Sequence, residues 1–253
     1  MTERPYVVLS CAISVDGYLD DTGPERLVLS SEADLDRVDA ERAAADALMV
    51  GAGTIRRDNP RLLIKSAERR AARVALGLHE QPIGVTITGS GDIDPGAQFF
   101  DPQWWSGDTA HGGPPQRIVY TATSAAGIAR EKFGGRAEVI DAGQPARLQT
   151  MLADLAQRGV RRLMVEGGAR LGTEFLTARL ADELQLVIAP FFVGDPAAPR
   201  FAGERPFPHG PGSRMTLAEV RNVDGVVLLR YLLGDVQAIS RTAGPLGGEV
   251  GHD

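Results

Sequence analysis

The sequence is poor in cysteine, the residue that is typical of disulfide-rich proteins and of many zinc-binding proteins. Its 253 residues include one cysteine, Cys11, so a disulfide within the chain and a zinc site made of several cysteines are excluded. Cys11 lies in the apolar run YVVLSCAI and is expected to be a small core residue rather than a nucleophile, because nothing in the sequence places a base beside it. We expect no metal site.

Long apolar runs and basic patches are also missing. No run approaches the roughly 20 residues that a membrane helix needs, and the N-terminus lacks the basic start and apolar core of a signal peptide. The net charge is -6, and no basic patch is mixed with aromatic residues, which argues against nucleic-acid binding. The densest basic stretch, Glu68–Arg73, is expected to be a solvated helix face. These absences predict a cytoplasmic protein that binds neither membrane nor nucleic acid.

The chain does contain apolar runs that alternate with segments of helical spacing. Strands are expected at Tyr6–Ile13, Ala47–Val50, Ile83–Thr88, Arg117–Tyr120, Val139–Ile140, Arg161–Val165, Glu183–Ala189 and Val226–Leu233. Helices are expected at Glu32–Ala45, Leu148–Arg158 and around Leu171–Leu176, the first capped by Ser30 or Ser31, with Leu35, Val38 and Ala45 as its core contacts. This alternation predicts an α/β fold with a mostly parallel sheet, partly antiparallel near the C-terminus.

One domain is expected to cover residues 1–235. Residues 236–253 lose all periodicity and are expected to form a flexible tail. The segment Phe100–Gln116, which contains Trp104 and Trp105, is expected to be a long surface loop, either reshaping a pocket or packing at a dimer edge.

Glycine follows a short predicted strand twice, in LMVGAGT at Leu48–Thr54 and in LMVEGGARL at Leu163–Leu171. Glycines let the backbone turn sharply and approach a ligand closely, and a helix N-terminus attracts phosphate. Neither turn matches the full dinucleotide fingerprint, because Arg56 stands at the place of its third glycine, and neither is a P-loop. The turns therefore indicate a phosphate or nucleotide site, or glycines that only end strands and allow close packing.

Polar residues follow the same predicted strands. Ser14 and Asp16 come after the first strand, Asp58 follows the first glycine turn, and Glu166 directly precedes the second. Asp16 and Asp58 could simply bond their own backbone in turns. Glu166 needs a partner or a ligand, because it ends a buried strand.

Three motifs in order, CAISVDGYL, DALMVGAGTIRRDNPRL and RLMVEGGARLGTEFLTARLADELQLVIAPFFVG, resemble the pyrimidine reductase family of riboflavin biosynthesis. That family comprises the C-terminal domain of the bifunctional deaminase-reductase and its stand-alone relatives, and the resemblance covers roughly Tyr6 to Leu233. It implies a dihydrofolate-reductase-like fold, a homodimer and NADPH. The reaction that it implies turns a ribosylaminopyrimidine 5′-phosphate into the ribitylamino form by hydride transfer to C1′.

The resemblance also implies roles for individual residues. Asp58 and Glu166 would be the catalytic residues, with Ser14 and Lys65 beside them in substrate binding. The residues implied in cofactor binding are Gly51, Gly53, Thr54, Thr88, Ser90, Gly167, Gly168, Ala169, Arg170 and Leu171. Among these, the hydroxyls of Thr88 and Ser90 would reach the 2′-phosphate, which favours NADPH over NADH.

The chain departs from the bifunctional pattern at two positions. Ser10 stands where those enzymes have lysine, and Lys65 where they have arginine. Lysine supplies charge to a phosphate but not a bidentate fork. The segment Ser31–Arg42 is closer to the stand-alone type. The deaminase motif, His-x-Glu with Pro-Cys-x-x-Cys, is missing from this chain, so deamination by this chain alone is excluded.

Two other functions stay open from the sequence. One is a reductase of the same fold that acts on another pterin, pyrimidine or folate-like substrate. The other is a nucleotide-binding protein without turnover. Either reductase would oxidise NADPH with some substrate, whereas a nucleotide-binding protein without turnover would bind NADPH and leave it unchanged.

Overall fold

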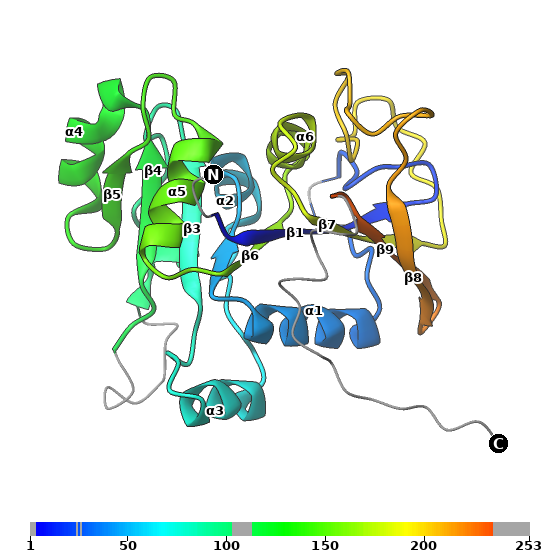
Figure 1. The fold of residues 1–253 in the computed structure, drawn as a ribbon, viewed down its shortest axis with the longest axis horizontal. Helices are drawn as coiled ribbons and strands as arrows, with labels where there is room; N and C mark the ends of the chain where they lie inside the picture. The colour runs from blue at the N-terminus through cyan, green and yellow to red at the C-terminus, as the bar shows by residue number, and fades with distance from the viewer. Residues whose placement is uncertain (1–3, 24, 26, 103–112, 235–253) are drawn as a thin grey trace.

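The computed structural model describes residues 4–23, 25, 27–102 and 113–234, and within them nine strands form one sheet (Figure 1). The sheet order is β5-β4-β3-β2-β6-β1-β7-β9-β8. The strands are β1 (Tyr6–Ser14), β2 (Ala47–Met49), β3 (Ile83–Thr88), β4 (Arg117–Thr121), β5 (Glu138–Asp141), β6 (Arg162–Glu166), β7 (Glu183–Ala189), β8 (Thr216–Val223) and β9 (Val226–Leu232). The seven strands from β5 to β7 are parallel, and β9 and β8 are antiparallel. The α/β class with a mostly parallel sheet is therefore confirmed.

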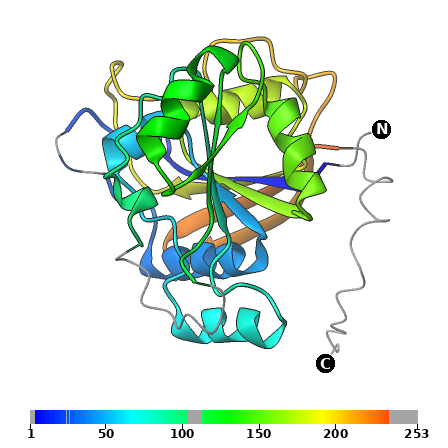
Figure 2. The same cartoon turned by 90° about the vertical axis from the view of Figure 1, so that its left-hand side faces the viewer.

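Helices cover both faces of the sheet. They are α1 (Glu32–Ala44), α2 (Ala52–Asp58), α3 (Ala67–Ala75), α4 (Thr123–Phe133), α5 (Leu148–Gln157) and α6 (Ala169–Thr177), with a 3-10 turn at Gln98–Phe100. Figures 1 and 2 both show α1 on one side of the central strands and α5 and α6 on the other. Each face is therefore closed by helices, as a parallel sheet of apolar strands requires.

The connections that leave two adjacent parallel strands, β2 and β6, lead toward opposite edges of the sheet. From β2 the chain continues to β3, whereas from the adjacent β6 it crosses over β1 to β7. In open α/β sheets a crevice for ligands opens where neighbouring strands diverge in this way, beyond their carboxyl ends. Residues that follow β2 and β6 therefore occupy the position at which such a fold binds ligands.

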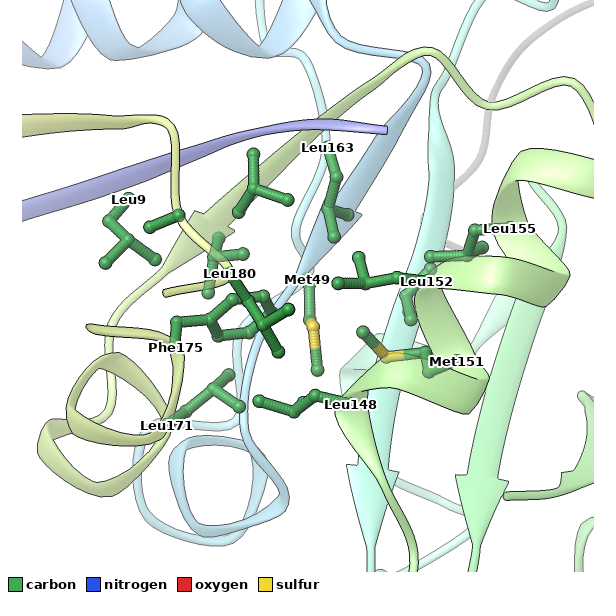
Figure 3. Packing of buried hydrophobic residues seen from close by; sticks show 14 of the residues in the cluster. Leu9, Met49, Leu148, Met151, Leu152, Leu155, Leu163, Leu171, Phe175 and Leu180 are labelled. Atoms are coloured by element: carbon green, nitrogen blue, oxygen red, sulfur yellow. The ribbon is translucent and has the colours of Figure 1, made fainter. Parts of the chain in front are cut away.

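The larger apolar core lies between the sheet and helices α5 and α6 (Figure 3). Strand residues such as Leu9, Met49 and Leu163 meet Met151 of α5 and Phe175 of α6, all nearly inaccessible to solvent. A second cluster fills the other face against α2, α4 and the 3-10 turn. Both helices that flank the crevice, α2 and α6, are thus anchored in core.

The predicted elements match the structure with a few differences. Ser31 caps α1 through a hydrogen bond from the Asp34 N–H to its hydroxyl, as expected. Leu35, predicted as a core contact, is exposed instead, and the buried residues of α1 are Asp34 and Asp39. Asp39 accepts from the N–H groups of Lys65 and Ser66 and so ties α1 to the segment before α3, whereas Asp34 accepts from Arg37 of the same helix and its Oδ2 has no partner in the described structure. Helix α4 and strand β8 have no counterpart among the predicted elements.

Arg73 corrects the prediction that Glu68–Arg73 is a solvated helix face. It is buried, and its Nη1 donates to the carbonyls of Ala43 and Ala45 at 2.8 Å while Nε donates to the His79 carbonyl at 2.9 Å. The Ala43 and Ala45 carbonyls lie at the end of α1, where the helix supplies no donors. Burial lowers the Arg73 pKa, which matches its bonds to neutral acceptors. Arg73 therefore caps α1 from α3.

Some predictions fall outside the described residues. Trp104 and Trp105 lie there, as does the predicted tail at 236–253. Within the described ranges, every helix is too short or too polar to cross a bilayer.

Gly84 in β3 is required by a buried arginine on the neighbouring strand. Arg117 donates from Nε to the Phe99 carbonyl at 2.6 Å, and its guanidinium carbon lies 5.0 Å from the centre of the Phe99 ring. A Cβ on Gly84 would lie 2.7 Å from Arg117 Cδ and closer still to Nη1. Because Arg117 is buried, moving its side chain away from a new Cβ would disturb its hydrogen bond to the Phe99 carbonyl.

We expect Gly84→Ala to destabilise the protein by about 1–3 kcal/mol, the usual cost of overpacking a core. The control is Gly127→Ala in α4, where a Cβ meets no atom within 4 Å of the described structure and the helix gains from losing glycine. Chemical denaturation of both variants measures the difference. Equal stability of the two would contradict the steric role of Arg117.

Candidate active site

The two glycine turns meet at the crevice between β2 and β6. Met49 pairs with Val165, so Gly51 and Gly167 follow neighbouring strand ends. A Cβ on Gly51 would lie 3.7 Å from the Leu171 Cβ, and a Cβ on Gly168 would lie 3.1 Å from the Thr54 hydroxyl oxygen. The first turn therefore packs against α6 and the second against α2. Two segments more than 100 residues apart form one surface.

The second turn leaves the start of α6 open. Gly167 and Gly168 have φ of +71° and +89°, a conformation that favours glycine. Among the described residues, no side chain caps α6, and its first turn holds no acid. The N–H groups of this turn therefore point at the crevice without a side-chain acceptor, an arrangement that suits an anion. In the same turn Leu171 is buried, whereas Arg170 is exposed and paired with Glu174.

A small hollow of about 20 Å³, partly open to solvent, adjoins the glycine pair. Its lining residues are Leu9, Ser10, Cys11, Leu19, Val165, Gly167, Gly168, Gly172 and Phe201. Most of them are apolar. Burial raises the pKa of the Cys11 thiol to about 12, so it stays neutral and serves as a wall. The hollow is therefore a small, mostly apolar recess beside the glycine pair.

Glu166 has a partner that the sequence did not reveal. Arg42 at the end of α1 donates from Nε and Nη2 to the two carboxylate oxygens, both at 2.6 Å, and from Nη1 to the Leu63 carbonyl at 3.0 Å. Burial opposes the charge of Arg42, but the charge and hydrogen bonds of Glu166 outweigh it, and the Arg42 pKa is raised. Arg42 therefore holds Glu166 against the segment that follows Asp58.

Asp58 ends α2 beside a left-handed Asn59, whose φ is 42°. Its side chain is 18% exposed, and Oδ1 accepts a hydrogen bond from Arg57 Nε at 3.0 Å. The other oxygen accepts no bond that the described structure shows. Asp58 can therefore still accept hydrogen bonds from a ligand.

Ser14 and Asp16 form a clamp between two loops. The buried Ser14 hydroxyl donates to Asp16 Oδ1 at 2.5 Å and accepts from the Tyr18 N–H at 3.0 Å. Asp16 also accepts from the N–H groups of Val193 and Gly194, at 3.1 and 2.8 Å. Asp16 thus joins the loop after β1 to the loop after β7, and the Ser14 hydroxyl is already used within its own loop.

The loop after β3 carries Thr88 and Ser90. Thr88 Oγ1 accepts from the Gly91 N–H at 3.2 Å, and Ser90 Oγ accepts from the Asp92 N–H at 3.3 Å. Thr88 is buried, whereas Ser90 is exposed. Of the two hydroxyls, Ser90 is the one that solvent and ligands can reach.

Lys65 is placed apart from the glycine turns. It directly precedes Ser66, the N-cap of α3, and its N–H donates to Asp39 Oδ1 of α1 at 2.6 Å. Figure 1 shows α3 at the opposite end of the molecule from α2 and α6. The ammonium group is exposed, but the structure does not bring it together with the other predicted site residues.

The comparison with known families decides what this site belongs to. The family described as RibD C-terminal domain matches residues 5–229. The chain belongs to this family. The resemblance drawn from the three motifs is therefore confirmed, and the family places the chain among the pyrimidine reductases of riboflavin biosynthesis.

Relatives support the same placement. The chain is 34% identical over 196 residues to the 2,5-diamino-6-ribosylamino-4(3H)-pyrimidinone 5′-phosphate reductase of Archaeoglobus fulgidus, covering 78% of this chain and 85% of the relative. It is 32% identical to the reductase of the same name from Methanothermobacter thermautotrophicus, covering 76% and 80%. The crystal structure of a pyrimidine reductase-like protein from Corynebacterium diphtheriae has the same fold, with a TM-score of 0.73, 22% identity and coverage of 91% and 92%.

The clamp made by Asp16 predicts a pH dependence of stability. Desolvation works against the ionised form of Asp16, but bonds from Ser14, Val193 and Gly194 outweigh it and lower its pKa from 3.8 to about 2. Folding therefore favours the carboxylate. The stabilisation is complete above the usual pKa and is lost as the pH falls towards about 2.

We expect Asp16→Asn to lower the thermal midpoint at pH 7, because the amide can accept only part of these bonds. The gap between wild type and variant should close as the pH falls from 4 to 2. Thermal melts across this range measure it. A gap that stays constant with pH would show that the charge of Asp16 contributes nothing to the clamp.

Proposed function

We propose that this protein is an NADPH-dependent reductase that converts a ribosylaminopyrimidine 5′-phosphate to the ribitylamino form. The observation that carries the proposal is the junction of the two glycine turns, with the open N-terminus of α6, at the crevice of a chain from this family. Relatives at 34% and 32% identity are named as reductases of the 2,5-diamino compound, which makes that pyrimidine the first substrate to test.

The residues at the junction fit a dinucleotide. Gly167, Gly168 and Ala169 would hold the pyrophosphate, because their N–H groups start a helix without a side-chain cap among the described residues. A side chain at Gly168 would fill the cradle, since its Cβ would meet Thr54. Arg170 and Leu171 continue that turn, and Gly51, Gly53 and Thr54 form the opposite wall. When bound, the cofactor supplies the hydride for C1′ of the sugar.

The adjoining loop would complete cofactor selection. Ser90 is exposed after β3 and would donate its hydroxyl to the 2′-phosphate. Thr88, whose hydroxyl accepts from Gly91, would shape that turn from beneath. Hydroxyls rather than an acid at this position favour the phosphorylated dinucleotide.

Asp58 and Glu166 are the acids that we assign to the reaction. Asp58 has a free carboxylate oxygen in the described structure and would accept hydrogen bonds from the amino groups of the pyrimidine. Glu166 is held in place by Arg42 and would face the ribose side. Ser14 would act by shaping the first loop, whereas Lys65, which lies beside α3, is not assigned to the site.

A homodimer is part of the proposal. On one face of the β8–β9 hairpin, the exposed Leu217 and Val220 pair with Tyr231 and Leu229, and the exposed Val227 continues the stripe. Apolar side chains gathered on an edge strand favour contact with a protein surface. A second copy of the chain would cover this stripe, and sedimentation at several protein concentrations tests it.

The test of the proposed activity is NADPH oxidation by the purified protein. The 2,5-diamino ribosylaminopyrimidine phosphate and its deaminated counterpart are supplied separately, and nicotinamide absorbance is followed. We expect oxidation with at least one of them. Oxidation only with a pterin or another pyrimidine would favour the alternative reductase, and NADPH binding without any oxidation would favour a non-catalytic nucleotide-binding protein.

We expect Asp58→Asn to lower kcat/KM by about 100-fold or more, because the amide cannot accept the same bonds from the ring amino groups. The NADPH dissociation constant should change by less than about twofold, since Asp58 lies at the far end of α2 from Gly51. Steady-state kinetics and a fluorescence titration with NADPH measure the two effects. Equal losses in both would mean that Asp58 only supports the fold.

A further inference from the structure

Two adjacent arginines at the end of α2 reach in different directions. Arg56 Nη1 donates to the Asp92 carbonyl at 2.6 Å, in the loop that carries Ser90. Arg57 Nη2 lies 3.0 Å from Asp20 Oδ2 in the loop after β1, and its Nε donates to Asp58 Oδ1 at 3.0 Å. One helical turn therefore connects the loops on both sides of the crevice.

Asp20 is a fixed anchor for Arg57. It is nearly buried, and its Oδ1 accepts hydrogen bonds from the N–H groups of Asp21 and Leu27, both at 3.1 Å. This leaves Oδ2 directed at the guanidinium. The position of Asp20 thus determines that of Arg57, and Arg57 in turn determines that of one oxygen of Asp58.

We propose that Arg57 is a positioning residue that aims the Asp58 carboxylate, while Arg56 positions the cofactor loop, so that the pair divides the site between substrate and cofactor. The inference rests on the proposed function, because it takes Asp58 as the pyrimidine-binding acid. It adds two residues and the Asp20 anchor to the machinery of the site.

Arg57 fixes the position of the Asp58 carboxylate and contributes little to the stability of the fold. Its side chain is 56% exposed, and ion pairs at such positions add little to folding free energy. The planar guanidinium can, however, hold two carboxylates in a fixed relation, which lysine cannot do. A reacting group displaced by about 1 Å can cost up to about 100-fold in rate. Loss of Arg57 should therefore affect catalysis and leave the fold intact.

The experiment compares Arg57→Gln, Arg57→Lys and Arg56→Gln with a matched control, Arg221→Gln. Arg221 is 52% exposed and pairs with Glu219 at 3.3 Å on β8, away from the crevice. For each variant we measure kcat and KM for the pyrimidine, the NADPH dissociation constant, the thermal midpoint, and amide hydrogen exchange at Asp21 and Leu27.

We expect Arg57→Gln to lower kcat/KM for the pyrimidine at least tenfold, with NADPH affinity unchanged and faster exchange at Asp21 and Leu27. Arg57→Lys should restore only part of the loss. Arg56→Gln should weaken NADPH binding several-fold, whereas the amides of Asp21 and Leu27 should exchange as slowly as they do in the wild type. Arg221→Gln should match the wild type in every measurement.

Two results would overturn the inference. In the first, wild type turns over and Arg57→Gln resembles Arg221→Gln in kinetics and exchange. In the second, Arg57→Gln and Arg56→Gln lose NADPH affinity and kcat/KM alike. Failure of the proposed function is a different result, because the wild type itself would then oxidise no NADPH with either pyrimidine. In that case the proposed role of Arg57 in positioning Asp58 for the reaction would also fall, even if amide exchange at Asp21 and Leu27 were altered.

Discussion

The contact between two glycine turns determines where this protein can hold a ligand. Gly168 approaches Thr54 so closely that a methyl group would lie 3.1 Å from the hydroxyl oxygen, and Gly51 lies against Leu171. This contact exists because β2 and β6 are neighbours in the sheet, although eight described elements, from α2 to α5, lie between them in the chain. Met49 of β2 pairs with Val165 of β6, so both turns follow the same end of the sheet, and among the described residues no side chain caps α6. Every other residue assigned to the site is arranged around this junction.

Side chains that tie loops to one another surround the junction. Asp16 joins the loop after β1 to the loop after β7, and Arg42 joins α1 to Glu166 and Leu63. Arg56 and Arg57 attach the end of α2 to the loops on either side. Binding groups held on rigid elements lose less entropy when a ligand arrives. The dense set of ties therefore accounts for an ordered site built mainly from loops.

Local pattern explains which parts of the fold were predictable. Strands β3 and β7 were bounded correctly because they are apolar runs with turn residues at their ends. The exposed strand β8 has no such pattern, and α4 begins without a side-chain cap among the described residues, so neither produced a signal. Leu35 was misassigned because Asp39, which bonds the segment before α3, takes part of the buried face of α1, and only Val38 of the helix packs on the second apolar cluster.

The site shows the same division. The glycine turns could be read from the sequence, because their residue types carry a backbone requirement. The partners Arg42 and Asp20 could not be predicted, because Arg42 lies far along the chain from Glu166, and Asp20 far from Arg57. Ser14 and Lys65 entered through the family motif, and only the structure shows that one is used in a clamp and the other lies beside α3.

The most direct test of the account is the affinity of Gly168→Ala for NADPH. The substitution adds one methyl group, which would meet Thr54 and sit on a backbone with φ of +89°. We expect at least tenfold weaker binding by fluorescence titration, while Gly127→Ala, at a position of α4 where a Cβ meets no atom within 4 Å of the described structure, binds as the wild type does. Unchanged affinity of a folded Gly168→Ala protein would contradict the claim that the junction of the two turns holds the cofactor.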